Sequence, residues 1–337
     1  MFDLCPAGPR DLYLARPHRE PHSPYRIGRF FLFLNFNIMS AKKVVDYKGR
    51  VLFLHGFTQS SSVFYAKTSA LRKKLKALKY QAVYLNAPYN LTPAQLPSSD
   101  ALSKFNSVAA EPDEATNYRA WWYRDASGRV NLDDAINAIR RYINDGEIID
   151  GSPEDQKVKQ DLLLESESSE TDTKSTETRE SDASSSKVTS VPPVVGVIGF
   201  SQGACLAGAL VNNFEAAFGI PLKFAILYSG FKLDTKLMPE YTSLYTQDDG
   251  ESTEARVLHV IGELDTIVGD DRAYTFYDIS KKNSHVLKHP GGHFVPNSKL
   301  LVNQVTNWIE SLDAEEKKRG ITGDADLADD LFEKLGL

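Results

Sequence analysis

Cysteine is scarce in this 337-residue chain, which contains only Cys5 and Cys205. Two cysteines in such different contexts predict neither a structural disulfide nor a zinc site, and we expect a reducing compartment. Concentrated basic charge is also lacking, because 45 acidic residues outnumber 39 basic ones and the net charge is -6. Phosphate binding requires clustered positive charge, so this balance argues against nucleic acid or anionic lipid as the main partner.

Long apolar runs are missing as well. The nearest is 30–34, far shorter than the roughly 20 residues that span a membrane. A basic region precedes it, but acidic residues interrupt that region and no small-residue cleavage site follows, so a secretory or organellar signal is not expected. We instead expect translation to begin at Met39 and residues 1–47 to form an extension that is disordered or not translated. The protein is expected in the cytoplasm, and also in the nucleus, without integral membrane association.

Short apolar runs alternate with helical patterns between Lys48 and Leu312. Six runs have the profile of strands buried on both faces: 51–54, 82–85, 194–198, 224–228, 257–261 and 285–288. Segments with helical spacing lie between or after them, at 64–78, 132–143, 202–218, 272–280 and 300–312. This alternation predicts a single α/β domain over 48–312, with a mostly parallel, doubly wound sheet that carries helices on both faces.

Two stretches break the pattern. Residues 151–190 are rich in serine, threonine and acidic residues and predict a disordered insert. Residues 89–118 are long and irregular, which indicates a functional loop. Ligands of open α/β sheets bind beyond the carboxyl ends of the strands. We therefore expect the 89–118 loop to be a lid that sets specificity, and the insert to emerge at the opposite, amino-terminal edge. Residues 313–337 are expected to form an acidic C-terminal tail.

The sequence Gly199-Phe200-Ser201-Gln202-Gly203 fits the G-x-S-x-G pattern of a nucleophile elbow. In this motif the serine lies on a very sharp strand-to-helix turn, where a side chain at either glycine would collide with backbone. The pattern alone is weak. Here it directly follows a run of valine and isoleucine and directly opens an alanine-rich helix, as the motif requires. It therefore predicts an α/β-hydrolase fold with Ser201 as the catalytic nucleophile.

A serine hydroxyl needs a base, and the base needs a carboxylate that orients it. In this fold the order along the chain is serine, acid, histidine. His293, on a loop just past the last strand, is the expected base, with His289 as the alternative. Asp265, just beyond the 257–261 strand, is the expected acid, with Glu263 as its nearest rival.

An oxyanion hole needs two backbone donors. The N–H of Gln202, directly after the nucleophile, is expected to supply one of them. The loop after the first strand is expected to supply the other, at Phe57 with Thr58 as the alternative. His55 precedes the glycine of that loop, and we expect it to brace the loop.

Seven blocks of the sequence form a set: 54–60, 86–88, 119–122, 199–204, 228–231, 262–265 and 291–293. This set resembles the FSH serine hydrolases, a fungal and animal family that includes an ovarian-cancer-associated hydrolase. The resemblance covers about Lys48 to Leu312 apart from the insert, and it implies Ser201, Asp265 and His293 as charge-relay residues. It also implies carboxylesterase or thioesterase activity without a metal or organic cofactor. The implied substrates are esters or thioesters of a small molecule or of an acyl-carrier protein.

Three assignments leave alternatives open. A non-catalytic ligand-binding or interaction protein could keep a hydrolase fold, although an intact serine, acid and histidine set favours an enzyme. Trp121 and Trp122 are expected to line the substrate pocket, but they could equally belong to the core. Cys205, one turn into the helix after Ser201, is expected to be a small buried residue and not a redox site.

Overall fold

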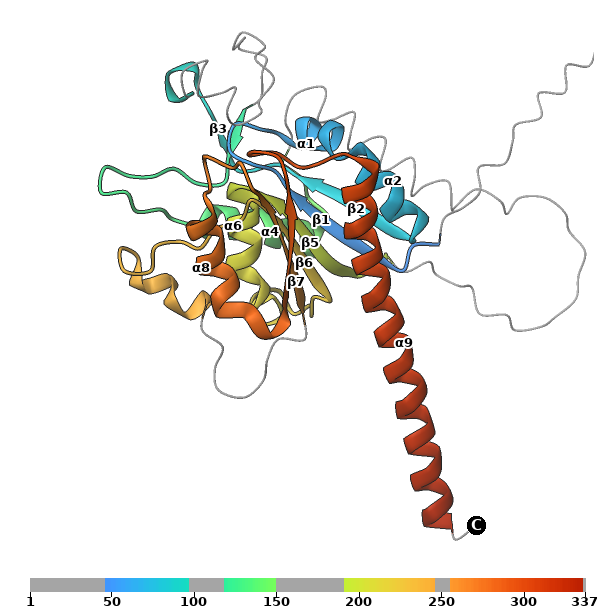
Figure 1. Cartoon of the computed structure of the whole chain (residues 1–337). Coiled ribbons are helices and arrows are strands. Elements are labelled where there is room, and N and C mark those ends of the chain that lie inside the picture. Colours follow the sequence, from blue (N-terminus) through green and yellow to red (C-terminus); the bar gives the residue numbers. More distant parts are fainter. Residues whose placement is uncertain (1–45, 97–117, 150–190, 246–254, 336–337) are drawn as a thin grey trace, which may run out of the picture. The chain divides into compact units, whose positions relative to one another are not determined.

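The computed structural model describes residues 46–96, 118–149, 191–245 and 255–335 (Figure 1). Nearly all of the N-terminal extension, most of the 89–118 loop and the whole of the 151–190 insert lie outside these ranges. What the sequence predicts for those segments therefore stays a prediction.

A six-stranded sheet forms the centre of the domain, in the order β2-β1-β5-β6-β7-β8. Every neighbouring pair of strands in it is parallel. The strands are β1 Gly49–Leu54, β2 Tyr80–Leu85, β5 Val194–Phe200, β6 Phe224–Tyr228, β7 Arg256–Gly262 and β8 Ser284–His289. Each of the six expected strands is thus confirmed. The central strands β5 and β6 are buried along their whole length, which explains why parallel strands read as continuous apolar runs.

Alternate residues of β1 point into two separate hydrophobic clusters, one on each face of the sheet. Leu52 and Leu54 belong to the first cluster, and Val51 and Phe53 belong to the second. The first cluster contains residues of α4 Asp133–Asp145, α6 Gln202–Val211, α7 Phe214–Phe218 and α8 Asp270–Ser280. The second contains residues of α1 Ser61–Lys67, α2 Ser69–Ala77 and α9 Lys299–Leu335. Helices therefore cover both faces, as expected for a doubly wound sheet.

Two helices that the sequence predicts as continuous are each divided. The 64–78 helix is α1 followed by α2, and the two meet at Thr68, whose hydroxyl contacts the Phe64 carbonyl and the Tyr84 hydroxyl at 2.7 Å each. The 202–218 helix is α6 followed by α7, which is preceded by Asn213. Apolar spacing continues across both breaks, so periodicity alone did not reveal them. Short 3-10 helices occur at Pro93–Gln95, Pro239–Leu244 and Lys281–Asn283.

The last helix does not end at Leu312, where its apolar pattern ends. Instead, α9 continues to Leu335, through most of the residues expected to form a tail. Polar contacts hold its continuation beyond Leu312 against the domain: Asp313 accepts hydrogen bonds from Lys48 and from the Tyr80 hydroxyl, both at 2.6 Å. These partners are about 230 or more residues away in the chain, so local sequence does not indicate the pairing.

A short antiparallel ladder closes the base of the 89–118 loop. In it, β3 Tyr89–Asn90 pairs with β4 Arg119–Ala120. The Arg119 guanidinium also donates to the Ala87 carbonyl at 2.8 Å. Because Ala87 lies just past the end of β2, the base of the loop is at the carboxyl-terminal edge of the sheet, as expected. Its role as a lid stays a prediction.

The residues that flank the acidic insert lie at opposite edges of the sheet. The prediction that the insert emerges at the amino-terminal edge is therefore wrong for the flank that precedes the insert. Before the insert, the Ile149 carbonyl accepts a hydrogen bond at 3.1 Å from Asn86, which directly follows the carboxyl end of β2. After the insert, the Pro192 carbonyl accepts one at 2.6 Å from Arg50, at the amino end of β1. The chain turns back after α4 because Ile148 and Ile149 pack against the hydrophobic core.

A parallel sheet with helices on both faces and a strand-to-helix turn after β5 is the α/β-hydrolase fold, as the sequence predicts. Among the residues that the structure describes, no helix is long and apolar enough to span a membrane.

Candidate active site

Ser201 lies on the turn between β5 and α6, with φ 51° and ψ -113°. Residues other than glycine rarely adopt positive φ, and holding one there costs about 1–3 kcal/mol. Backbone hydrogen bonds fix the turn: the Ser201 N–H donates to the Tyr228 carbonyl at 2.9 Å, and the Cys205 N–H donates to the Ser201 carbonyl at 2.9 Å. The sharp turn predicted from the motif is therefore present, and the neighbouring strand β6 supports it.

Both glycines of the motif are in places where a side chain does not fit. A Cβ atom on Gly203 would lie 2.1 Å from the Leu54 carbonyl oxygen, and a Cβ atom on Gly199 would lie 2.5 Å from the Gly203 carbonyl oxygen. The first turn of α6 thus packs directly on the end of β1. The close backbone approach that the sequence predicts at these two positions is confirmed.

Ser201, His293 and Asp265 form a continuous chain of hydrogen bonds. His293 Nε2 lies 2.9 Å from Ser201 Oγ, and His293 Nδ1 lies 2.8 Å from Asp265 Oδ2. With Asp265 ionised, Nδ1 carries the proton and Nε2 accepts from the serine hydroxyl. The three residues are only 5%, 6% and 8% exposed. The structure therefore brings together the three side chains that the sequence predicts as nucleophile, base and acid.

Both carboxylate oxygens of Asp265 are held by donors. Its Oδ1 accepts the N–H groups of Ile267 at 2.9 Å and Val268 at 2.8 Å, while Oδ2 faces His293. Burial disfavours the charged form, but the hydrogen bonds from His293 and Val268 outweigh burial and hold the pKa of Asp265 below its ordinary value. The carboxylate is thus kept negative beside the imidazole.

The loops that carry the acid and the histidine are hydrogen-bonded to each other. The Glu263 N–H donates to the His289 carbonyl at 2.9 Å, and the Leu264 N–H donates to the Gly291 carbonyl at 3.0 Å. A Cβ atom on Gly262 would lie 2.6 Å from the Gly291 carbonyl oxygen, so only glycine allows this contact. The two loops therefore position Asp265 and His293 as one unit.

The alternative acid and base have other surroundings. Glu263 is exposed. His289 is buried, and its Nδ1 accepts the Gly291 N–H at 3.2 Å. Burial, opposed by the charges of Asp265 and Glu263, lowers the pKa of His289. Asp270 and Asp271, two further acidic residues that follow β7, lie in the first turn of α8.

The two backbone donors expected at the oxyanion hole flank Ser201. Gln202 is the first residue of α6, where N–H groups have no acceptor within the helix. Phe57 lies on the loop after β1, and this loop approaches the serine: a Cβ atom on Gly56 would lie 3.5 Å from Ser201 Cβ. The alternative donor, the Thr58 N–H, donates to the Arg119 carbonyl at 3.1 Å. Phe57 as the second donor stays a prediction.

His55 is held in place by backbone groups on both sides of its ring. The Ala87 N–H donates to its Nε2 at 3.1 Å, and its Nδ1 lies 2.8 Å from the Gly56 carbonyl. Because Nε2 accepts, Nδ1 carries the proton and donates to that carbonyl. His55 therefore braces the loop, as expected, and is not placed as a second base.

The Gln202 side chain also helps to build this site, which the sequence did not predict. Its Oε1 accepts the Trp121 N–H at 2.8 Å, and its Nε2 donates to the Trp122 carbonyl at 2.9 Å. The Trp121 indole donates to the His55 carbonyl at 2.8 Å. The tryptophans are 0% and 3% exposed and belong to the core, and their contact with substrate stays a prediction. The sequence signal that could have revealed this role is a polar residue at the start of an otherwise apolar helix, α6.

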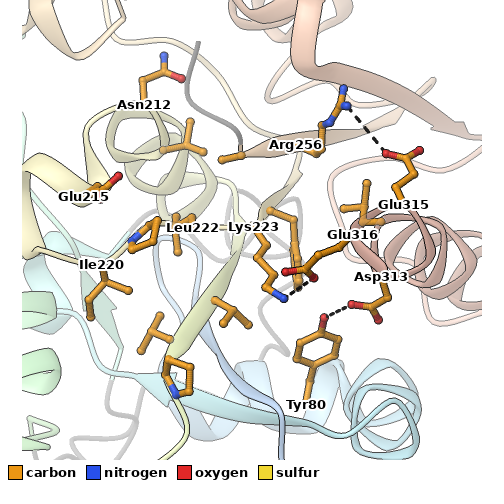
Figure 2. Close-up of a pocket in the computed structure, with 18 of the residues that line it drawn as sticks. Tyr80, Asn212, Glu215, Ile220, Leu222, Lys223, Arg256, Asp313, Glu315 and Glu316 are labelled. Atoms are coloured by element: carbon orange, nitrogen blue, oxygen red, sulfur yellow. Dashed lines mark hydrogen bonds and ion pairs between the residues drawn. The ribbon is translucent and has the colours of Figure 1, made fainter. Parts of the chain in front are cut away.

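A cavity of about 950 Å³ lies at the other edge of the sheet, around the amino ends of β5, β6 and β7 (Figure 2). There Lys223 points toward Glu316 at 2.5 Å and the Tyr80 hydroxyl toward Asp313 at 2.6 Å. None of the residues around Ser201 lines this cavity. Within the described ranges, no three histidine, cysteine, aspartate or glutamate side chains are grouped so that they could hold a metal ion.

Comparison with known proteins agrees with this geometry. The family described as "Serine hydrolase (FSH1)" matches residues 44–305. The chain is 33% identical over 285 residues to Family of serine hydrolases 3 of Saccharomyces cerevisiae, covering 80% of this chain and 86% of that protein. It is 28% identical over 262 residues to Esterase OVCA2 of Danio rerio, covering 73% and 90%. The protein belongs to the FSH1 family of serine hydrolases and has the α/β-hydrolase fold.

Proposed function

We propose that this protein hydrolyses acyl esters or thioesters through an acyl-enzyme intermediate on Ser201. The observation that carries the proposal is the chain of hydrogen bonds from Ser201 through His293 to Asp265, at 2.9 and 2.8 Å. Membership of a serine hydrolase family and similarity to a relative named as an esterase support it.

In the first half-reaction, Ser201 Oγ attacks the acyl carbonyl carbon while His293 Nε2 takes its proton. Asp265 stays ionised, orients the imidazole through Nδ1 and stabilises the imidazolium. The negative charge on the carbonyl oxygen is bound by the N–H groups of Gln202 and Phe57. His293 then gives its proton to the leaving alcohol or thiol.

In the second half-reaction, His293 takes a proton from water, and the hydroxide formed attacks the acyl-enzyme. The tetrahedral intermediate collapses, the acid is released, and Ser201 regains its proton from His293. Every proton in this cycle moves through His293 Nε2, so no metal or organic cofactor is needed for the chemistry proposed.

The proposed substrates are esters or thioesters of a small molecule or of an acyl-carrier protein, which covers carboxylesterase and thioesterase activity. Trp121 and Trp122 are proposed to shape the acyl side of the pocket. They are tied by hydrogen bonds to Gln202, the residue next to the nucleophile. The rival proposal is a binding protein that keeps the hydrolase fold without turnover.

A fluorophosphonate probe separates the two. We expect it to label the wild type, and we expect Ser201→Ala to lose labelling together with at least about 1000-fold of its turnover of p-nitrophenyl esters and acyl-CoA thioesters. Ser311→Ala, which removes an exposed hydroxyl on α9, is the matched control. A wild type that neither labels nor turns over any substrate would favour the binding protein. Labelling that survives in Ser201→Ala would exclude Ser201 as the nucleophile.

A further inference from the structure

The hydroxyl of Ser229 is buried without a regular hydrogen-bond partner. Ser229 directly follows β6 and is 2% exposed, and its Oγ is one of a few buried polar side-chain atoms in the described ranges that lack a partner. Leaving such a group unsatisfied destabilises the folded protein. A native structure that retains the cost calls for an explanation at that position.

The backbone of Ser229 is also held in an unfavourable conformation. Its φ is 48°, and it is one of four residues other than glycine with positive φ in the described ranges. Three of these four, Thr58, Ser201 and Ser229, follow strands at the carboxyl-terminal edge of the sheet, where Ser201 lies. Such backbone strain is typically retained at functional sites.

The backbone of Ser229 connects the strand beside the nucleophile to the strand that carries the acid. Its N–H donates to the Val260 carbonyl of β7 at 2.9 Å, and the preceding residue, Tyr228, accepts the Ser201 N–H at 2.9 Å. Asp265 lies on the turn that follows β7. The backbone of Ser229 is therefore fixed between the end of β6 that supports Ser201 and the strand β7 that leads to Asp265.

The Asp265 carboxylate is the acceptor available to this hydroxyl. Burial opposes the charged form of Asp265, and the contacts that nevertheless lower its pKa are those with His293, Val268 and, as the weakest, the Ser229 side chain. Two N–H groups occupy Oδ1 and one imidazole faces Oδ2. A carboxylate has about four lone-pair positions, so a fourth donor can be accommodated.

We propose that Ser229 is a positioning residue whose hydroxyl donates to the Asp265 carboxylate and keeps it aligned with His293 when the imidazole becomes positively charged. The inference rests on the triad proposed above. The proton of Ser201 moves to His293 Nε2, while Ser229 keeps its own proton throughout and no covalent bond to it forms or breaks. A carboxylate that is already aligned with the imidazole stabilises the imidazolium without rearranging, so loss of this alignment slows the chemical step more than it weakens substrate binding.

Two substitutions separate the hydroxyl from the strained backbone. Ser229→Ala removes the hydroxyl and keeps the cost of positive φ, whereas Ser229→Gly removes both. We expect kcat to fall about 10-fold in both variants with KM little changed, as one charge-assisted hydrogen bond would cause. A fall in kcat at unchanged KM separates a positioning role from a general loss of folded protein, which would leave the KM and the kcat of the remaining active fraction unchanged.

A buried hydroxyl at the other edge of the sheet provides the control. Ser284, at the start of β8, is 8% exposed and donates to Ser280 Oγ at 2.8 Å. Ser284→Ala should lower the melting temperature and leave both kcat and KM unchanged. Because the glycine variant relieves strain, it keeps the test usable if the alanine variant folds poorly.

The inference fails if Ser229→Ala or Ser229→Gly retains wild-type kcat within about twofold. It also fails if only the alanine variant is impaired, because the backbone and not the hydroxyl would then be responsible. Ser201→Ala, measured in parallel, tests the triad itself. Turnover that survives in Ser201→Ala refutes the proposed function, whereas its loss together with a wild-type-like Ser229→Ala refutes only the role of Ser229.

Discussion

Gln202 Oε1 accepts the backbone N–H of Trp121 at 2.8 Å. The contact joins the first residue after Ser201 to a segment 81 positions earlier in the chain. Because Gln202 Nε2 also donates to the Trp122 carbonyl at 2.9 Å, one buried side chain satisfies two buried backbone groups. The helix that begins at Gln202 is thereby fixed against the tryptophan segment, and the proposed oxyanion donor is fixed with it.

Replacing Gln202 with alanine should therefore destabilise the protein and slow it, although the backbone N–H remains. The N–H of Trp121 and the carbonyl of Trp122 would both lose their partner. At about 1–3 kcal/mol each, we expect a loss of about 2–4 kcal/mol in urea unfolding, together with a lower kcat/KM. Gln304→Ala on the exposed face of α9 should change stability by less than about 0.5 kcal/mol. Equal stability of the two variants would show that the hydrogen bonds of the Gln202 side chain do not stabilise the protein.

Asp265→Asn should lower kcat by about 1000- to 10,000-fold while the fold is retained. Asparagine keeps the shape of the side chain, but it removes the charge that stabilises the imidazolium and favours the wrong tautomer of His293. Ester turnover, with circular dichroism to verify folding, is the measurement. Glu263→Gln, only two residues away on the same loop and exposed, is expected to leave kcat within about twofold. Comparable losses in both variants would place the acid elsewhere.

Gly203→Ala should be strongly destabilising. The added methyl group would lie 2.1 Å from the Leu54 carbonyl oxygen and 2.5 Å from that of His55, and backbone atoms cannot turn away as a side chain can. We expect a loss of about 3 kcal/mol or more in urea unfolding. At Gly269 an added Cβ atom meets nothing within 4 Å, so Gly269→Ala should cost less than about 1 kcal/mol. A Gly203→Ala variant as stable as the wild type would show that α6 can shift away from β1.

Acid should destabilise the protein partly through His259. This residue is 2% exposed within β7, and burial lowers its pKa to about 4 from an ordinary value of 6.5. The unfolded chain binds the proton more readily than the folded one, so the stability contributed by neutral His259 is complete above about pH 6.5 and is lost as the pH falls toward 4. Between pH 7.5 and pH 5 the loss corresponds to about 2 kcal/mol.

His259→Asn provides the test, since asparagine remains neutral and can bond the hydroxyl of Ser284, which lies 3.3 Å from His259 Nε2. Urea unfolding at pH 7.5 and pH 5 should show a smaller drop in the variant than in the wild type, by about 2 kcal/mol. An identical drop in both proteins would mean that other groups cause the acid sensitivity.

Several features of the site were predictable because local sequence carries them. The glycines around Ser201 mark a turn that excludes side chains, and the apolar runs mark strands covered on both faces. Asp265 and His293 each follow such a run, and parallel strands end at a common edge, so their meeting with Ser201 follows from their positions in the chain. The same positions favour Asp265 over Glu263 and His293 over His289, and in the structure Asp265 bonds His293 while His293 bonds Ser201.

Other features depended on contacts between distant segments. The apolar pattern predicts that α9 ends at Leu312. The helix continues beyond it, and Lys48 and Tyr80, which are far away in the chain, hold the continuation at Asp313. The sequence predicts that the insert emerges at the amino-terminal edge, because it follows a helix of the domain that leads toward that edge. Packing of Ile149 instead turns the chain back before the insert begins.

The sequence by itself determined the parallel sheet, the turn at Ser201 and the identity of the two residues that approach it, because periodicity, glycine sterics and chain order are local properties. Only the tertiary structure decided which groups support them. The bond from Gln202 to Trp121 and the bond from the Ser229 N–H to Val260 join separate strands and loops, and such pairings exist only once the sheet has assembled.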